Sequence, residues 1–415
     1  MTFADPVSAK NAASARWLSI VGIGEDGVAA LSPAARALVE SAEVVFGGQR
    51  HLALAGTLIH GRARAWPTPF GRAVADVLGE RPKRVCVLAS GDPFHYGIGA
   101  QLARQVPPAE MVTVPAPSAF SLSAARLGWP LAVTTLLALN GRALDLIRPH
   151  LHPGARILAL SAGAETPGAL AQLLVTTGFG QSRLIILEAL GGARERVRSA
   201  LAANFDLAAI DPLNTIGIEV VAGVQARIIP RAPGLADSLF EHDGQITKRE
   251  IRTLTLSALA PRRGERLWDV GAGAGSVAIE WMLADSSLRA LAVEADTERA
   301  ARIARNAAAL GVPGLEIVHA PAPAALAGLA RPDAIFIGGG ASEPGVLDRC
   351  FEALPAGGRL VVNAVTLATE ALLMAQHAEL GGELTRIAIA RAEPLGDKTG
   401  WRPAMPITQW SWTKP

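Results

Sequence analysis

Short apolar runs alternate with amphipathic segments along most of the chain, and many of these runs end in glycine. The run at residues 17–23 predicts a strand that enters the glycine turn VGIGEDG. Ser32 and Pro33 then predict the start of a helix, because serine caps helix amides and proline suits the first helical position. Another buried strand is expected at residues 85–89. The alternation predicts an α/β fold.

The pattern fails around residues 226–245, where proline, glycine and charge are mixed without a sustained period. A new series of strands and helices begins after this break. We therefore predict two unlike α/β domains, at residues 16–228 and 244–415, joined by a linker at residues 229–243.

One helix of the second series has clear predicted ends. Thr297 is expected as its N-cap, Glu298 lies in its first turn, and Gly311 is expected to stop it. The strand before it ends at Glu294, and a later apolar strand, RLVVNAV, contains Asn363.

Composition narrows the classes of protein that remain. The chain has 415 residues, of which 50% are hydrophobic and 18% charged, so it is globular, and its net charge of +2 is too small for a dedicated nucleic-acid binder. Its two cysteines lie far apart, which disfavours a disulfide framework or a thiolate metal site. Residues 1–15 are expected to be a leader without the apolar core of a signal peptide. No uncharged apolar run reaches the roughly 18 residues of a membrane span. A cytoplasmic protein without membrane contact is expected.

The stretch LWDVGAGAGSVAIEW carries the first chemical signal. Its glycines follow the pattern GxGxG, at Gly271, Gly273 and Gly275, and position 276 is serine, whereas a dinucleotide loop has glycine there. Asp269 precedes the loop. A carboxylate there would repel a pyrophosphate but would attract a cationic ligand. Glu294, about twenty residues on, can accept hydrogen bonds from ribose hydroxyls.

These residues resemble those of the class I S-adenosylmethionine-dependent methyltransferases, a Rossmann-like fold. The resemblance implies that Asp269, the three glycines and Glu294 contact S-adenosylmethionine, with Thr247 from the preceding segment QITKREIRTLTLSAL. It also places Asn306 in the helix that follows the second strand.

The first half carries a different series of motifs: VGIGEDG, SGDPFHYGIG, PAPSAFSLSAARLGWP and LEALGG. This series resembles the tetrapyrrole methylases, the class III fold in which two α/β subdomains enclose a cofactor cleft. The resemblance implies cofactor contacts from residues of these motifs, namely Gly91, Asp92, His95, Ser118, Ala119 and Glu188. Glu25 departs from this family, which often has proline after the first Gly-x-Gly.

The pairing of the two folds resembles the fused, decarboxylating C5,15-methyltransferases of the aerobic cobalamin pathway. That resemblance implies methylation of precorrin-6B, an anionic tetrapyrrole, at C5 by the first domain and at C15 by the second, with loss of the C12 acetate carboxylate to give precorrin-8. It implies one S-adenosylmethionine site per domain, no metal, and a homo-oligomer, a tetramer through the C-terminal domain. The alternatives are the equivalent reactions on cobalt-precorrin intermediates of the anaerobic pathway, a methyltransferase for RNA or protein, and a non-catalytic protein on methylase folds.

Candidate residues for the substrate are less specific. Asn363, at the carboxyl end of its strand, and Glu343, after the IFIGGG loop, are the candidate catalytic residues. Arginine pairs well with carboxylates, so cations near the two clefts are candidate anchors: Arg62, Arg64, Arg142, Lys248, Arg249 and Arg402.

Overall fold

The computed structural model describes residues 16–415, and the leader predicted for residues 1–15 lies outside them. The described residues form two compact units, which are considered separately. The first unit contains residues 16–142 and 153–226, and the second contains residues 143–152 and 227–415. The predicted division at residues 229–243 stays a proposal.

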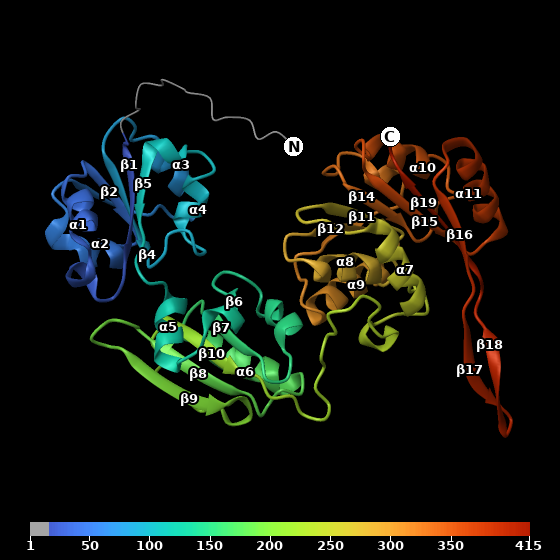
Figure 1. The fold of residues 1–415 in the computed structure, drawn as a ribbon, viewed down its shortest axis with the longest axis horizontal. Helices are drawn as coiled ribbons and strands as arrows, with labels where there is room; N and C mark the ends of the chain where they lie inside the picture. Colours follow the sequence, from blue (N-terminus) through green and yellow to red (C-terminus); the bar gives the residue numbers. More distant parts are fainter. Residues whose placement is uncertain (1–15) are drawn as a thin grey trace, which may run out of the picture. The chain divides into compact units, whose positions relative to one another are not determined.

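The first unit begins with a sheet of five parallel strands in the order β3-β2-β4-β1-β5 (Figure 1). Along β1, Leu18 and Ile20 join one core cluster while Val21 and Ile23 join another, because successive side chains point to opposite faces. A sheet buried on both faces accounts for the nearly continuous apolar runs of the sequence. The elements are β1 (Leu18–Ile23), α1 (Pro33–Glu40), β2 (Val44–Gly47), α2 (Gln49–Ala55), β3 (Arg62–Ala65), α3 (Ala73–Leu78), β4 (Val85–Ser90), α4 (Ile98–Leu102) and β5 (Met111–Val114).

A second sheet completes the first unit, with the order β6-β7-β10-β8-β9. Its β6–β7 pair is parallel, and its other pairs are antiparallel. The elements are α5 (Ala119–Leu127), β6 (Thr135–Ala138), β7 (Arg156–Leu160), α6 (Thr166–Thr176), β8 (Arg183–Glu188), β9 (Arg196–Leu201) and β10 (Asn214–Glu219).

The second unit is built on a seven-stranded sheet in the order β13-β12-β11-β14-β15-β19-β16. Its strands from β13 to β15 are parallel, and β19 is antiparallel to both of its neighbours. The elements are α7 (Arg249–Leu259), β11 (Arg266–Val270), α8 (Ser276–Ala284), β12 (Arg289–Glu294), α9 (Thr297–Ala309), β13 (Glu316–His319), β14 (Ala334–Ile337), α10 (Val346–Ala353), β15 (Arg359–Ala364), α11 (Leu367–Leu380), β16 (Glu383–Ile387) and β19 (Ile407–Thr413).

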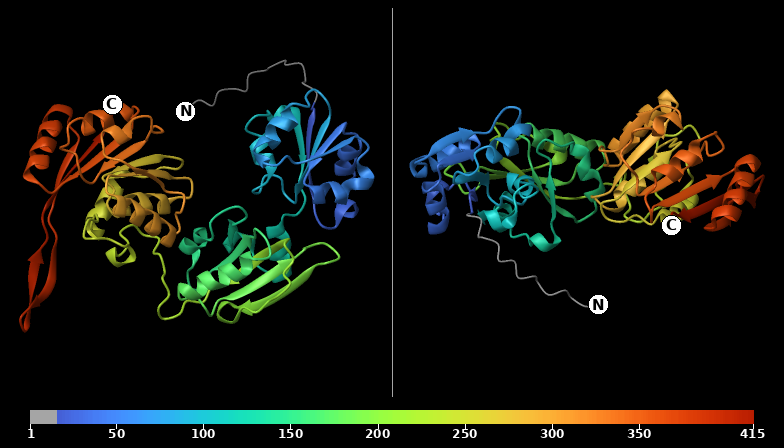
Figure 2. Two further views of the ribbon diagram at one scale, coloured as in Figure 1. Left: turned by 180° about the vertical axis from the view of Figure 1, so that it is seen from behind. Right: turned by 90° about the horizontal axis from the view of Figure 1, so that it is seen from above.

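A two-stranded hairpin, β17 (Ala390–Leu395) and β18 (Lys398–Pro403), extends from the second unit's sheet (Figure 1). Figure 2 shows the hairpin again from behind, and Arg391 of β17 forms an ion pair with Glu250 of α7. Leu395 and Trp401 on this hairpin are largely exposed, at 72% and 77%.

The predicted α/β class is confirmed in both units. The N-caps of two helices can be compared directly with the predicted ones. Ser32 caps α1 as predicted, since its side chain accepts from the Ala35 amide at 3.2 Å. The N-cap predicted at Thr297 is wrong by one residue. Asp296 caps α9 and accepts from the Arg299 amide at 2.9 Å, because its carboxylate is the one placed to reach the third amide of the helix.

Residues 229–243, predicted as a linker, contribute Ile229, Leu235 and Phe240 to the core of the second unit. A buried ion pair holds this segment. The guanidinium of Arg252, fully buried, donates from Nε to Glu280 at 2.5 Å, and it also donates to the carbonyl oxygen of Leu235. Glu280 in turn accepts from the backbone amide of Leu235 at 2.9 Å.

The two cysteines, Cys86 and Cys350, are buried and free, and burial raises the pKa of each thiol to about 12. Within residues 16–415, no helix is both long and apolar enough to cross a membrane.

We expect Arg252→Met to lower the free energy of unfolding by about 3–5 kcal/mol, because Glu280 would stay buried without its partner. Urea unfolding of the full chain, followed by tryptophan fluorescence, measures this. Arg249→Met, an exposed position on the same helix, is the control and should change little. The double variant Arg252→Met/Glu280→Met should recover part of the loss. Equal losses of unfolding free energy in Arg252→Met and Arg249→Met would contradict the prediction.

Candidate active sites

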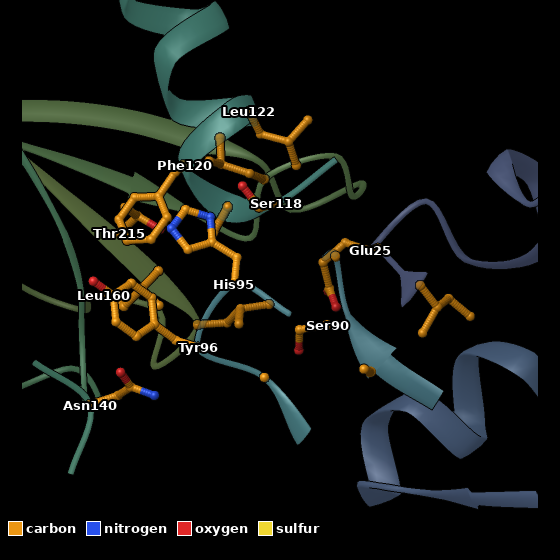
Figure 3. A pocket seen from close by; sticks show the side chains of 18 of the residues that line it. Glu25, Ser90, His95, Tyr96, Ser118, Phe120, Leu122, Asn140, Leu160 and Thr215 are labelled. Atoms are coloured by element: carbon orange, nitrogen blue, oxygen red, sulfur yellow. The ribbon is translucent and has the colours of Figure 1, made fainter. Parts of the chain in front are cut away.

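A cavity of about 350 Å³ lies in the first unit, lined by residues of both of its sheets. Figure 3 shows Glu25 and Ser90 on one side of the cavity, and His95, Phe120 and Thr215 on the other. The carboxyl ends of β1 and β4 and the start of α5 meet here, because parallel strands bring their following loops to one edge of the sheet.

Four of the six residues predicted for the first cofactor site line this cavity: Gly91, His95, Ser118 and Ala119. The ring of His95 lies 4.8 Å from that of Phe120 and 5.2 Å from that of Tyr96, so an aromatic wall forms on one side. Ser118 caps α5 by accepting from the Ser121 amide at 3.2 Å.

Asp92 and Glu188 are not among the residues lining the cavity. The carboxylate of Asp92 accepts from the Phe94 amide at 2.9 Å, which closes the turn after β4. Burial opposes ionisation of Glu188, but hydrogen bonds from Arg196 and Arg198 outweigh it and lower its pKa to about 2. The structure therefore gives Glu188 a partner set within its own sheet.

The arginines predicted as anchors in this unit also have other partners. Arg62 and Arg64 both pair with Glu80, and the guanidinium of Arg64 lies over the ring of Phe46. Arg142 lies 5.8 Å from the centre of the Tyr96 ring.

A polar cluster that the sequence analysis missed lines the cavity instead. Arg50 and His51, just after β2, meet Ser90 at the end of β4 and Glu25 after β1. His51 Nε2 lies 2.8 Å from Arg50 Nη2 and 2.8 Å from Ser90 Oγ. Burial, and then the charge of Arg50, lower the pKa of His51 to about 4. The signal was present in FGGQRH, a cation and a histidine just after a predicted strand end.

In the second unit the GxGxG loop connects β11 to α8, and its three glycines all have positive φ, between 57° and 74°. A side chain at Gly271 would place its Cβ 2.7 Å from the carbonyl oxygen of Gly339, and one at Gly273 would place it 2.9 Å from that of Gln245. The loop is therefore closely packed between two other backbone segments. Glycine is required both by the positive φ values and by this close packing.

Two carboxylates stand behind this loop. Glu294 accepts from the Gly273 amide at 2.8 Å and from the Asp296 amide at 3.0 Å. Asp269 accepts from the Ala278 amide at 3.0 Å through Oδ2, whereas its buried Oδ1 has no hydrogen-bond partner among the described residues. Burial, with the Glu294 charge adding to it, raises the pKa of Asp269 to about 7.

These features fit a cationic ligand without phosphate. The loop is backed by acceptors, and an unsatisfied carboxylate oxygen nearby is compensated when a donor or a positive charge approaches it. Within residues 16–415, no group of three or more histidine, cysteine, aspartate or glutamate side chains lies close enough to hold a metal ion.

Other predicted residues of the second unit have defined positions. Asn306 ties the loop to the preceding segment, donating to the carbonyl oxygens of Ala274 and Glu241 at 3.0 Å. The carbonyl oxygen of Thr247 accepts from Arg252, which fixes the backbone there. Glu343 is exposed just after β14.

Asn363 lies at the carboxyl end of β15 in a small amide cluster. Its Nδ2 donates to Thr255 Oγ1 at 3.0 Å, and its Oδ1 accepts from Gln409 Nε2 at 2.9 Å. The predicted anchors Lys248 and Arg249 are exposed at the start of α7. Arg402 pairs with Glu393 across the hairpin at 3.2 Å.

The two folds and the GxGxG loop with its two carboxylates indicate a chain of two unlike methyltransferase units. The Tetrapyrrole (Corrin/Porphyrin) Methylases family matches residues 18–206, and the Precorrin methyltransferase domain family matches residues 238–414. The chain belongs to the family of precorrin-6Y C5,15-methyltransferases (decarboxylating). The resemblance predicted from the sequence is thereby confirmed, and membership of a methyltransferase family implies the use of S-adenosylmethionine.

Two curated relatives match nearly the whole chain. The precorrin-6Y C(5,15)-methyltransferase [decarboxylating] of a Sinorhizobium species is 59% identical over 99% of this chain and 100% of its own. The enzyme of that name from Mycobacterium tuberculosis is 43% identical over 95% of this chain and 99% of its own. Among solved structures, the C-terminal domain of precorrin-6Y C5,15-methyltransferase from Rhodobacter capsulatus is 50% identical, with a TM-score of 0.43, over 45% of this chain and 100% of that one.

The raised pKa of Asp269 predicts how stability depends on pH. Without ligand, the folded chain holds a proton there that the unfolded chain has lost, between the ordinary value of 3.8 and about 7. The free energy of unfolding should therefore fall across this window, by up to about 1.4 kcal/mol per pH unit from this group.

Asp269→Asn removes this titration and keeps an oxygen for the Ala278 amide. The difference in unfolding free energy between variant and wild type, from urea unfolding at pH 5, 6, 7 and 8, should grow up to about pH 7 and then level off. A difference that is constant across this range would contradict the raised pKa.

Proposed function

We propose that this chain methylates precorrin-6B, the compound called precorrin-6Y in the names of its relatives, at C5 and C15. We also propose that the chain removes the C12 acetate carboxylate as CO₂, so that the product is precorrin-8. The observation that carries this is the presence of two different methyltransferase units on one chain, which relatives of that name match over almost all of their length. Those names specify precorrin without cobalt, which supports the aerobic substrate over the cobalt-containing alternative.

We assign C5 methylation to the first unit. S-adenosylmethionine, when bound, supplies an electrophilic methyl group, and the chain must hold the nucleophilic carbon in line with it. The aromatic wall of His95, Tyr96 and Phe120 suits a flat conjugated ligand. Such positioning can contribute about 7–11 kcal/mol to lowering the barrier. The low pKa of His51 keeps that ring neutral near pH 7, so it can accept a hydrogen bond there.

We assign C15 methylation and decarboxylation to the second unit. In this proposal Glu294 accepts from the ribose hydroxyls, Asp269 faces the cationic part of the cofactor, and Thr247 and the three glycines shape the loop around it. Loss of CO₂ leaves an electron pair that the conjugated macrocycle itself can absorb. The amide of Asn363 has one N–H beyond the bond to Thr255, and we propose that it donates this to the substrate. Glu343 remains the candidate for moving a proton.

We further propose that copies of the chain associate through the second unit, as a tetramer. The exposed Leu395 and Trp401 of the β17–β18 hairpin support an interface on this unit. The buried free thiols are consistent with a cytoplasmic enzyme, and we propose no resident metal.

Incubation of the full chain with precorrin-6B and methyl-labelled S-adenosylmethionine tests the function. We expect two labelled methyl groups in the product, at C5 and C15, and one CO₂ released per macrocycle. Mass spectrometry counts the methyl groups, and carbon NMR locates them. A product with one methyl group, or without loss of CO₂, contradicts the proposed reaction.

Gly273→Val tests the division of work between the units. Valine would clash with the carbonyl oxygen of Gln245 and would strain the backbone at a φ of 57°. We expect loss of C15 methylation, by about a hundredfold or more if the clash costs about 3 kcal/mol, and unchanged C5 methylation of a suitable intermediate.

Gly314→Val is the matched control for this experiment, because an added Cβ at Gly314 meets no atom within 4 Å. It should leave both methylations unchanged. If Gly273→Val abolishes C5 methylation and spares C15 methylation, the assignment of reactions to units is reversed.

A further inference from the structure

We propose that Arg50 is the carboxylate-binding residue of the cavity in the first unit. This inference rests on the proposed C5 methylation by that unit and names a residue for ligand recognition within it. Arg50 is not among the arginines that the sequence predicted as anchors for substrate carboxylates.

The composition of the cavity wall is the first observation. Among the described residues that line it, Arg50 is the one lysine or arginine and Glu25 is the one aspartate or glutamate. The remainder of the wall is apolar, aromatic or neutral and polar. An anionic ligand group that enters this cavity therefore has one guanidinium available to it.

The guanidinium is held in place from several sides. Its Nη1 donates to Glu25, and its Nη2 donates to Ser90 Oγ at 3.1 Å and lies 2.8 Å from His51 Nε2. An arginine nitrogen can only donate, so the imidazole must present a lone pair at Nε2, which requires His51 to be neutral. Burial and the nearby charge favour that neutral form, as the low pKa of His51 indicates.

The guanidinium still has capacity for a ligand. The three contacts use three of its five N–H donors, and the other two have no partner among the described residues. The side chain is 35% exposed, whereas that of Glu25 is 11% exposed. Glu25 also lies 3.6 Å from Arg194, so its charge is shared between two guanidiniums. Arg50 is thus oriented, partly accessible and only partly neutralised, which suits charge-assisted recognition of a carboxylate.

Glu25 lies in the first glycine turn, directly after β1, and this turn places its carboxylate beside the guanidinium of Arg50.

The proposed function places two ligands with such a carboxylate in this cavity. One is the amino-acid part of S-adenosylmethionine, and the other is the tetrapyrrole with its acidic side chains. The recognition chemistry is the same for both, so kinetics must distinguish the two sources.

The test uses Arg50→Gln in the full chain, with C5 methylation followed by the position of the label. We expect KM for one of the two substrates to rise about ten- to hundredfold, as for loss of a hydrogen bond to a charged group. Arg50→Lys should show a smaller rise, because it keeps the charge and loses the planar donors. C15 methylation by the same variant chains should keep its KM values, which reports that the second unit is folded, and an unchanged kcat for C5 methylation reports the same for the first unit.

Arg84→Gln is the matched control. Its side chain is exposed and pairs with Glu43 at 3.7 Å, just before β4 begins, at the end of the sheet away from the cavity. It should leave C5 methylation unchanged.

Product inhibition of C5 methylation identifies the source of the carboxylate. S-adenosylhomocysteine carries the amino-acid carboxylate, and methylthioadenosine lacks it. If Arg50→Gln weakens inhibition by the first compound alone, Arg50 binds the cofactor. If neither inhibition changes and KM for the tetrapyrrole rises, Arg50 binds the substrate.

Unchanged KM values for both substrates in Arg50→Gln would overturn the inference. So would an equal loss in Arg50→Gln and Arg84→Gln. Absence of C5 methylation in the wild-type chain would instead overturn the proposed function, so the two failures are distinguishable.

Discussion

A buried guanidinium organises the second unit. Arg252 has no exposed side-chain surface, and it bonds to Glu280 on α8 and to the carbonyl oxygens of Leu235 and Thr247. The segment held in this way carries Gln245, whose carbonyl oxygen packs against Gly273 of the GxGxG loop. The ion pair therefore fixes the backbone segment against which the loop packs. Because a buried charge without its partner is costly, this pair resists replacement of either member alone.

The proposed cofactor sites of the two units are built differently. In the second unit, glycines bring backbone segments together in front of two buried carboxylates, Asp269 and Glu294. In the first unit, the cavity has an aromatic wall on one side and the cluster around Arg50 on the other. The site of the second unit depends on spacing within a short stretch of sequence. The site of the first unit depends on residues that follow three different strands.

The roles predicted for the site residues stay predictions, but the structure shows which of these residues lie in local arrangements and which have partners from other strands. The GxGxG loop, Asp269 and Glu294 lie close together in the chain or one strand apart. Glu294 accepts from Gly273 of the loop, and Asp269 accepts from Ala278 of the helix that follows it. Glu188 also matched a motif, yet Arg196 and Arg198 from the neighbouring strand surround it. The motif match alone could not reveal that partner set, because antiparallel pairing of β8 with β9 creates it.

The sequence by itself determined the α/β class of both units, the glycine loop with its carboxylates, and the family to which the chain belongs. These depend on local spacing, on hydrophobic period and on motifs of a few residues. Only the tertiary structure decided that Arg50, and not Arg62 or Arg64, lines the first cavity. The physical reason is that the strand order of the sheet decides which charged side chains lie next to each other. That order joins β2 to β4 and β4 to β1, although these strands are far apart in the chain.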